Sequence, residues 1–116
     1  MKKFFDGDLE MGKNLHLQNG TSVWICFETN RTVLKIGIMG GSTNHAVESF
    51  RVHGDKKLLL TVDDAGFQAN NEERSWLIPV EKRGPHKCYG LEAIQGGGGG
   101  NRKVKIKEIL MWESLN

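Results

Sequence analysis

The sequence predicts an all-β fold, in the form of an antiparallel β-sandwich or jelly roll. Short runs rich in β-branched and aromatic residues recur along the chain, with turn sequences between them at regular spacing. No segment carries apolar residues at a helical period over the length of a helix. Fifteen glycines against two prolines are typical of many tight turns. The 116 residues are expected to form one domain, residues 1–116, with a hydrophobic core of its own.

Composition and charge narrow the classes of function. With 38% hydrophobic and 26% charged residues and a net charge of +2, the chain does not have the pattern of a dedicated nucleic-acid-binding protein. No apolar run reaches the roughly 18 residues that a transmembrane segment needs. The chain begins like a signal peptide, but Asp6 and Asp8 end that pattern. We expect a cytoplasmic protein if the chain is complete, or an extracellular module if it belongs to a longer secreted protein.

The expected strands cover most of the chain. Residues 22–28 (SVWICFE) are apolar at successive positions, which is typical of a strand covered on both sides. A short strand is expected near Leu15, and Asn19 and Gly20 after it predict a hairpin turn. The remaining strands are expected at residues 32–39, 48–53, 58–62, 75–80, 88–95 and 102–112.

The connections between these strands carry their own signals. A turn at residues 54–57 predicts that its two neighbouring strands form a hairpin. Residues 63–74 are the longest polar connection. Pro79 indicates that its strand ends there or lies at the edge of a sheet, because proline cannot donate to a ladder of hydrogen bonds. Residues 96–100, all glycine, are expected to be a loop that joins two strands.

The closing strand, residues 102–112, alternates between apolar and basic side chains. Glu108 falls in register with the apolar face, where a carboxylate is costly unless it is hydrogen-bonded, paired or bound to a metal. The basic face favours a guard on an outer strand against edge-to-edge pairing, although it would also suit a phosphate, a sulfate or an acidic polysaccharide. The apolar face consists of Val104, Ile106, Leu110 and Trp112, and the basic face of Lys103, Lys105 and Lys107 with Arg102 beside it.

Two cysteines and two tryptophans also lie in the expected strands. Cys26 and Cys88 fit no metal-binding spacing, which favours two small buried apolar side chains. A disulfide between them is the alternative if the chain is secreted. Trp24 and Trp112 are expected to lie in the core.

Four stretches, taken in order, carry a likeness to a known family. They are the acidic turn at residues 5–8, the strand led by Trp24 with the core strand after it, the hairpin of residues 49–61, and the closing pair at residues 88–91 and 104–109. Together they resemble the galactose-binding-like β-sandwich, the fold of discoidin domains of the coagulation-factor C-terminal type and of family 32 carbohydrate-binding modules. That family's early turn normally leads into a threonine and a tryptophan, and this chain has residues 9–14 (LEMGKN) there instead.

The resemblance implies a structural calcium site. In the family, the early acidic turn and the glutamate of the final strand hold the ion, which in this chain implies Asp6, Asp8 and Glu108 as metal ligands. Calcium prefers several hard oxygen ligands, and loop carbonyls would supply the rest. The alternative without a metal is that Glu108 accepts backbone amide hydrogens or pairs with a lysine or arginine. Either arrangement would tie the last strand to the first turn.

The resemblance also implies a ligand site in loops at one end of the sandwich. A sugar is held there by an aromatic face and by polar side chains that pair with its hydroxyl groups. One suitable loop contains Asn44 and His45. The alternative is ordinary solvated polarity, with Trp76 as a core residue. The second loop offers Phe67, Asn70, Asn71, Arg74 and Trp76.

The sequence does not favour catalysis. Its four histidines are scattered, and no zinc-protease spacing or nucleophile motif is present. We therefore expect a non-catalytic carbohydrate-binding module whose partner is a glycan or a glycosylated surface. The alternative is a structural or protein-interaction module, such as a phage or cell-surface assembly component, that binds a protein partner or its own copies and no sugar.

Overall fold

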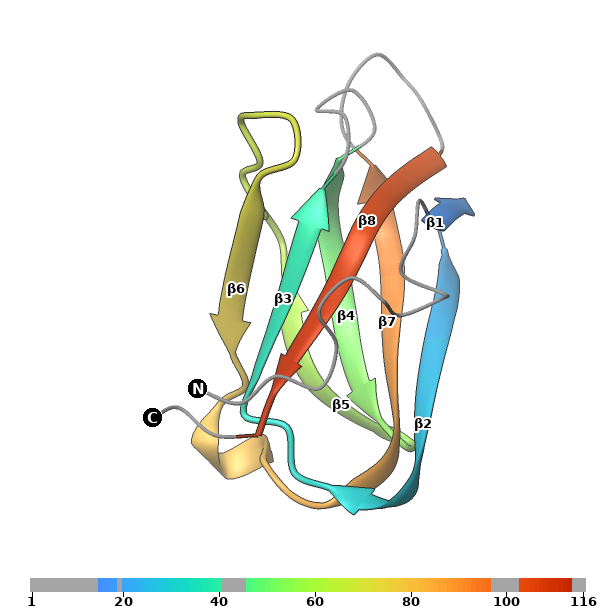
Figure 1. Cartoon of the computed structure of the whole chain (residues 1–116), viewed down its shortest axis with the longest axis vertical. Helices are drawn as coiled ribbons and strands as arrows, with labels where there is room; N and C mark the ends of the chain where they lie inside the picture. Colours follow the sequence, from blue (N-terminus) through green and yellow to red (C-terminus); the bar gives the residue numbers. More distant parts are fainter. Residues whose placement is uncertain (1–14, 19, 41–45, 97–102, 114–116) are drawn as a thin grey trace.

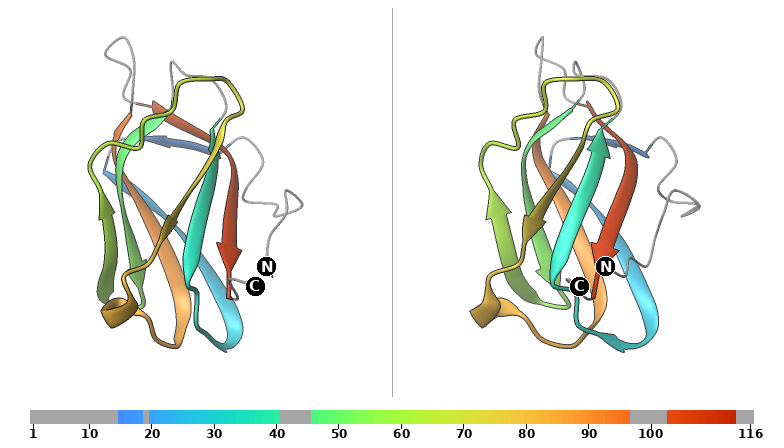
Figure 2. Two further views of the ribbon diagram at one scale, coloured as in Figure 1. Left: turned by 90° about the vertical axis from the view of Figure 1, so that its left-hand side faces the viewer. Right: turned by 60° about the vertical axis from the view of Figure 1, so that its left-hand side comes forward.

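The computed structural model describes residues 15–18, 20–40, 46–96 and 103–113. These residues form eight strands and one short 3₁₀ helix. The strands make two antiparallel four-stranded sheets, in the orders β1-β8-β3-β6 and β2-β7-β4-β5, which face each other as a sandwich (Figure 1, Figure 2). The predicted fold class is confirmed. The elements are β1 (Leu15–Gln18), β2 (Thr21–Arg31), β3 (Lys35–Gly40), β4 (Val47–Gly54), β5 (Lys57–Val62), β6 (Glu73–Leu77), η3 (Val80–Lys82), β7 (His86–Gly96) and β8 (Lys103–Trp112).

The hydrophobic core lies between the two sheets. Ile36 and Ile38 of β3 belong to it from one sheet, and Phe50 and Val52 of β4 from the other. All four are at most 1% exposed. The two residues of each pair are two positions apart, as the alternation of side chains along a strand requires. Burial of one such side chain contributes about 1.5–3 kcal/mol to folding.

Of the two predicted hairpins, the one at residues 54–57 is confirmed. The one at Asn19 and Gly20 is wrong, because β1 pairs with β8 and lies in the other sheet from β2. β4 and β5 form the predicted hairpin, with Phe50 opposite Val62. β6 is an edge strand of its sheet and ends at Leu77. The prediction from Pro79, that its strand ends there or lies at a sheet edge, is therefore confirmed. The strand expected at residues 32–39 begins later, at Lys35. The reason is that the chain crosses there from the sheet of β2 to the sheet of β3.

Tyr89 anchors that crossing. Its hydroxyl donates to the carbonyl oxygen of Arg31 at 2.5 Å and accepts from the amide of Val33 at 3.0 Å. Burial raises the pKa of the Tyr89 hydroxyl above its ordinary value. Tyr89 is 1% exposed. Its buried hydroxyl therefore provides hydrogen-bond partners for the carbonyl of Arg31 and the amide of Val33, where the chain passes from one sheet to the other.

β2 departs from its prediction. It is an edge strand, paired only with β7 within the described residues, and its outer face is open to solvent. Ile25 belongs to the core, and Val23 and Phe27 are packed against it. Trp24 points the other way and is 42% exposed. The expectations of a strand covered on both sides and of Trp24 in the core are therefore wrong.

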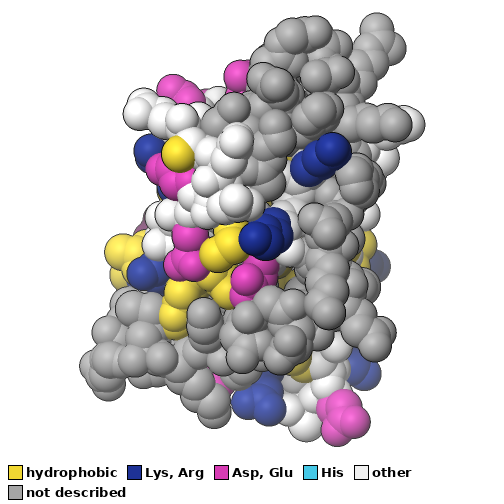
Figure 3. Space-filling model, turned by 45° about the horizontal axis from the view of Figure 1, so that its top comes forward, with side chains coloured by type: hydrophobic (Ala, Val, Ile, Leu, Met, Phe, Trp, Pro, Cys, Tyr) yellow, Lys and Arg dark blue, Asp and Glu magenta, His cyan; other side chains and the backbone are white. Residues whose placement is uncertain are grey.

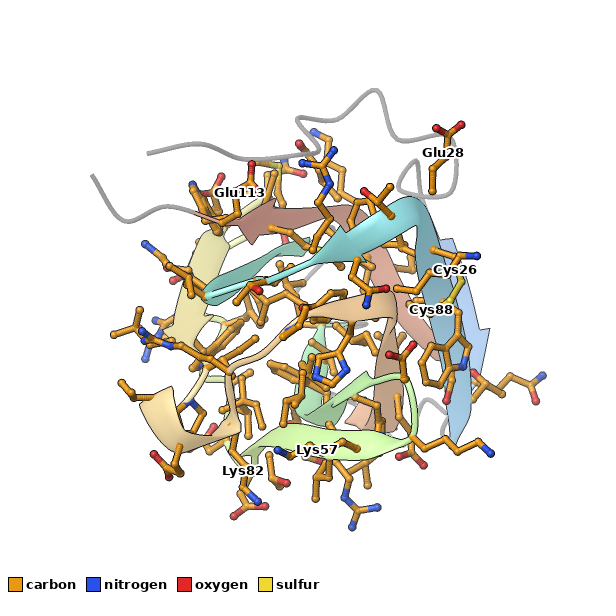
Figure 4. All side chains as sticks on the ribbon, turned by 90° about the horizontal axis from the view of Figure 1, so that it is seen from below. Cys26, Glu28, Lys57, Lys82, Cys88 and Glu113 are labelled. Carbon is orange, nitrogen blue, oxygen red and sulfur yellow. A yellow bond between two sulfur atoms is a disulfide. The ribbon has the colours of Figure 1, made fainter. Side chains whose placement is uncertain are left out.

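The two cysteines form a disulfide. Cys26 on β2 lies opposite Cys88 on β7, with their Cα atoms 4.0 Å apart, and the sulfur atoms are bonded (Figure 4). Cys26 is exposed and Cys88 half-buried, so the preferred reading of two buried apolar side chains is wrong and the alternative holds. The bond lies on the outer face of the sheet and joins two strands that are 62 residues apart in the chain.

β8 contains a β-bulge that reverses which side chains face the core. Two consecutive residues of β3 lie opposite Glu108 and Ile106, so Lys107 is an extra residue on β8. Because side chains alternate with a period of two, one extra residue exchanges the two faces of the strand. The core-facing residues of β8 are Val104, Ile106, Ile109 and Met111.

The predicted apolar face of β8 is therefore wrong beyond the bulge. Glu108, Leu110 and Trp112 lie on the outer face of the sheet, opposite residues of β3 that also point away from the core. All three are nevertheless buried, at 8%, 0% and 7% exposure. Trp112 packs over Gly37, where a Cβ atom would lie 2.9 Å from the ring. Nζ of Lys35 stands 4.8 Å from the centre of the same ring.

β8 is not the outer strand that its lysines were expected to protect. β8 lies between β1 and β3 in its sheet, but β1 pairs with residues 103–106 and β3 with residues 106–112, so most of β8 is paired on one side only within the described residues. Lys107 is exposed at the bulge and Lys105 is half-buried. The expectation of an outer strand is therefore wrong, because strand order could not be read from the sequence of β8, and the protective role of the lysines stays a prediction. The described residues contain no helix with the length and apolar character of a membrane span.

Candidate functional site

Several strand ends meet at one end of the sandwich, which we call the loop end. β3 ends there at Gly40, β4 begins there at Val47, and residues 63–72 join β5 to β6 (Figure 1). This is the kind of position at which a ligand site was expected. Asn44 and His45, two of the expected ligand residues, lie outside the described residues. The loop of residues 63–72 is described in full.

The Glu72 carboxylate organises this loop. Oε1 accepts hydrogen bonds from the backbone amides of Gln68 at 2.7 Å and Ala69 at 3.2 Å. Oε2 accepts from Nε of Arg74 at 2.7 Å. The carbonyl oxygen of Glu72 accepts from the amide of Gly40 at 2.9 Å, which fixes the loop to the end of β3. Nothing in the sequence sets Glu72 apart from its polar neighbours, because the fold of the loop decides which amides reach it.

These contacts stabilise the charged form of Glu72. The amide of Gln68 has the largest effect, and together with Arg74 and Ala69 it holds the pKa of the Glu72 carboxyl below its ordinary value of 4.5. Partial burial acts in the opposite direction and is outweighed. The loop therefore carries a fixed negative charge at neutral pH, and its shape depends on that charge.

Two aromatic side chains connect the loop to the core. The Trp76 ring lies edge-to-face against Phe50, with centroids 4.9 Å apart, and against Phe67, with centroids 6.3 Å apart. Phe67 also lies over Gly40, where a Cβ atom would be 3.5 Å from its ring. Phe67 and Trp76 are both half-buried. Each ring thus has a packing role and keeps only part of its surface for a ligand.

The polar residues of the loop are more accessible. Asn70 and Asn71 are exposed at its tip, and Asn71 has a φ of 61°, a left-handed conformation that asparagine tolerates. The guanidinium of Arg74 is 38% exposed and lies beside Gly66, whose added Cβ atom would be 3.5 Å from Nη1. The structure therefore places Arg74 beside Glu72 and Phe67 beside Trp76, and presents the two asparagines to solvent.

The described residues seen at this end carry charges of both signs. In a view turned toward the loop end, acidic and basic side chains of the described residues are interspersed, with apolar side chains between them (Figure 3).

Glu108 is the second feature that the sequence singled out. Its side chain is 8% exposed, and its Oε1 atom is buried with no hydrogen-bond partner among the described residues. A buried carboxylate oxygen without a donor is costly, and a metal ion would satisfy it. Asp6 and Asp8 lie outside the described residues, and the described part of the chain holds no cluster of three metal-binding side chains. The state of Glu108 fits a calcium ligand, and the calcium site stays a prediction.

Comparisons with known proteins rest on structure. The sequence matches no protein-family model and no curated protein. The family 32 carbohydrate-binding module of Streptococcus pneumoniae EndoD superposes with a TM-score of 0.71 at 15% identity, over 98% of this chain and 94% of that one. The family 32 module of AlyQ, solved with 4,5-unsaturated mannuronic acid, gives 0.69 at 11% identity over 98% and 95%.

A third structure agrees with these two. The family 32 module of C. perfringens NanJ, solved with galactose, has a TM-score of 0.64 at 16% identity, over 90% of this chain and 79% of that one. These likenesses span nearly the whole chain at low sequence identity. The protein therefore has the galactose-binding-like β-sandwich fold of family 32 carbohydrate-binding modules.

Proposed function

We propose that this protein is a non-catalytic carbohydrate-binding module that holds a sugar at the loop end. The observation that carries the proposal is the fold, since the three structures described above are carbohydrate-binding modules, two of them solved with a sugar bound. The loop of residues 63–72 and the beginning of β6 support it, because together they carry a fixed carboxylate, a guanidinium, two exposed amides and two half-buried aromatic rings.

The residues of this loop and of the beginning of β6 have distinct roles in the proposal. Asn70 and Asn71 donate to and accept from sugar hydroxyl groups, and Arg74 donates from the guanidinium nitrogens that do not face Glu72. The exposed parts of Phe67 and Trp76 contact the apolar face of a pyranose. Glu72 acts through its neighbours by holding the loop in shape. The disulfide fits a module that works in an oxidising compartment, where glycan-bearing surfaces are found.

Calorimetry after a glycan array tests this proposal. The variant Asn71→Gly removes the amide, and glycine accepts the left-handed backbone conformation of that position, so the loop keeps its shape. We expect at least a tenfold weaker affinity, about 1.4 kcal/mol, for the best glycan. Asn30→Gly is the matched control, because it makes the same change in an exposed residue of β2 near the opposite end of the sandwich. Absence of any saccharide binding at millimolar concentration would refute the proposal.

We also propose that Glu108 takes part in a calcium site, with Asp6 and Asp8 as the further acidic ligands. The buried, unpartnered Oε1 atom in the described structure is the observation that supports it. The ion would neutralise a charge that is otherwise costly inside the protein and would stabilise the fold. It would play no part in contacting the sugar.

A protein-interaction module is the second candidate function. A surface groove of about 240 Å³ lies between β5 and the turn that contains η3, and its walls are mainly apolar. Lys57 and Lys82 are seen on this side of the molecule in Figure 4. Light scattering coupled to gel filtration decides between the candidates. A stable oligomer that Leu58→Ser dissociates, together with no glycan affinity, would favour this role. The groove is lined by Leu58, Leu59, Leu60, Thr61, Pro79 and Lys82.

A further inference from the structure

Trp24 lies flat on the outer face of the β2-β7-β4-β5 sheet. It is opposite Gly90 on β7, and a Cβ atom added to Gly90 would lie 2.7, 2.7 and 2.8 Å from Cδ2, Cε2 and Cε3 of the indole. Cδ2 is the ring-fusion atom bonded to the other two, so a point equally close to all three lies above the plane of the ring. One face of the indole therefore rests on Gly90, and the other faces away from the sheet. The side chain is 42% exposed.

Polar side chains stand beside this ring at fixed positions. His53 on β4 is also opposite Gly90, with its ring centroid 6.3 Å from that of the indole. Nε2 of His53 is 3.3 Å from Oε1 of Glu92, which lies two residues beyond Gly90 on the same face of β7. Nη1 of Arg51 is 3.8 Å from the same oxygen, longer than a hydrogen bond, and the Arg51 side chain is 46% exposed. An imidazole thus lies beside the aromatic plane, and a carboxylate and an accessible guanidinium lie in the next row on the same face of the sheet.

The arrangement follows from the strand register. One row across three strands contains Ser22, Glu92 and Arg51, and the next row contains Trp24, Gly90 and His53. Glycine in the central position leaves room for the indole to lie down across β7, where any larger residue would lift it. The ring and the polar groups are therefore held by the sheet itself, which is more rigid than the loop end.

We propose that Trp24, with Arg51, His53 and Glu92, forms a second carbohydrate-binding site, on the sheet face and separate from the loop end. Its ligand is a pyranose unit whose apolar face stacks on the outward face of the indole, while its hydroxyl groups pair with the three polar side chains. This second site rests on the proposed function, because its ligand is again a sugar. It concerns another surface, since β2 and β6 are edge strands of different sheets on opposite sides of the molecule (Figure 1).

The competing explanation is that the ring only covers a glycine in a strand, which would stabilise the sheet without a ligand. NMR titration separates the two. The three tryptophans give three indole N–H signals, and Trp24→Thr identifies that of Trp24 while keeping a residue that favours strands. The probes are galactose, N-acetylgalactosamine and an oligomannuronate, each added to millimolar concentration.

We expect one probe to shift the Trp24 indole signal and the backbone amide of His53 with one common affinity. Those shifts should persist in Asn71→Gly, and Trp24→Thr should weaken binding at this face at least tenfold while the loop end still binds. Trp24→Tyr should retain a measurable part of the affinity, because it keeps an aromatic plane. If the Trp24→Thr variant does not fold, the shifts in the unaltered protein and in Trp24→Tyr decide the question.

Two results would overturn the inference. In the first, shifts occur only at the loop end for every probe, which refutes the sheet-face site and leaves the proposed function standing. In the second, Trp24→Thr folds, is less stable, and binds every probe with unchanged affinity, which assigns Trp24 to packing alone. Binding at the sheet face that persists without any loop-end shift would support this site and refute the loop-end proposal.

Discussion

At the scale of single residues, two glutamates show how the same group takes different roles in this fold. Both oxygens of Glu72 have donors, so its charge shapes the loop around it. Glu108 has a buried oxygen without a donor in the described structure. An unsatisfied buried polar atom costs on the order of 1–3 kcal/mol, and more for a charged group. Glu72 is therefore a positioning residue, whereas Glu108 calls for a partner.

The state of Glu72 predicts how the loop responds to acid. Because its pKa is lower in the folded protein than in the unfolded chain, its stabilising effect is complete above the ordinary value of 4.5 and is lost as the pH falls through the folded-state pKa. We expect the amides of Gln68 and Ala69 to lose protection from hydrogen exchange below that point, relative to the intrinsic exchange rate at each pH, and sugar affinity at the loop end to fall as well. Amide exchange measured by NMR as a function of pH tests this.

The variant Glu72→Gln should show the reduced protection of the Gln68 and Ala69 amides already at neutral pH, because it lacks the charge that holds Arg74 and strengthens the bonds from the two amides. Glu73→Gln is the matched control, since Glu73 is the next residue, is exposed, and makes the same change in charge. Equal exchange rates in the two variants would contradict the role given to Glu72.

At the scale of elements, the sequence predicts strands more reliably than it predicts their faces. The alternation in β8 is correct on each side of Lys107 and fails across it, because the bulge is defined by the partner strand. In β2 both faces are apolar, and the pattern alone does not distinguish a covered strand from an edge strand that carries an exposed Trp24 and a disulfide. Faces depend on strand order, and strand order here depends on pairings between distant residues.

The candidate site shows the same limit. The polar run between β5 and β6 was enough to locate the loop, because a long polar connection between strands lies at an end of the sandwich. The packing of Trp76 against Phe50 could not be read from the sequence, since it depends on which face of β6 meets the other sheet. For the same reason the sequence did not indicate the surface around Trp24 and His53.

The disulfide between β2 and β7 predicts a large effect on stability. Cys26 and Cys88 close a loop of 62 residues, for which loop-closure entropy gives a stabilisation on the order of 4 kcal/mol. We expect Cys26→Ala with Cys88→Ala to lower the free energy of unfolding by about 2–4 kcal/mol, measured in urea. The paired residues are on the outer face, so the core should be unchanged. A loss below about 0.5 kcal/mol would show that the bond does not restrict the unfolded chain.

At the scale of the whole molecule, pairings between distant segments hold the sandwich together. β2 pairs with β7 and β3 with β8, so most of each sheet forms only when the two halves of the chain meet. β8 lies at the centre of this arrangement, between β1 and β3. A ligand that binds a residue of β8 therefore acts on the stability of the entire fold and not on one loop.

The predicted calcium site can be tested through that stability, with Glu108→Gln as the decisive variant. At about 100 times its dissociation constant, calcium would stabilise the protein by about 2.7 kcal/mol and raise the melting temperature by roughly 10 °C. In calcium the unaltered protein should be more stable than Glu108→Gln. In chelator Glu108→Gln should be the more stable, because it removes the charge from a buried oxygen that lacks a donor among the described residues. The variant should then melt above the unaltered protein, and in calcium below it.

A difference in melting temperature that changes sign between calcium and chelator separates a metal site from an effect of the substitution that does not involve a metal. If Glu108 serves only as a buried charge, Glu108→Gln stabilises the protein by the same amount in calcium and in chelator. If backbone amides satisfy the carboxylate in solution, the variant is less stable in both. Glu28→Gln is the control, because it makes the same chemical change at an exposed position of β2 and should respond to calcium as the unaltered protein does. Only a calcium ligand at Glu108 makes the sign of the effect depend on the ion.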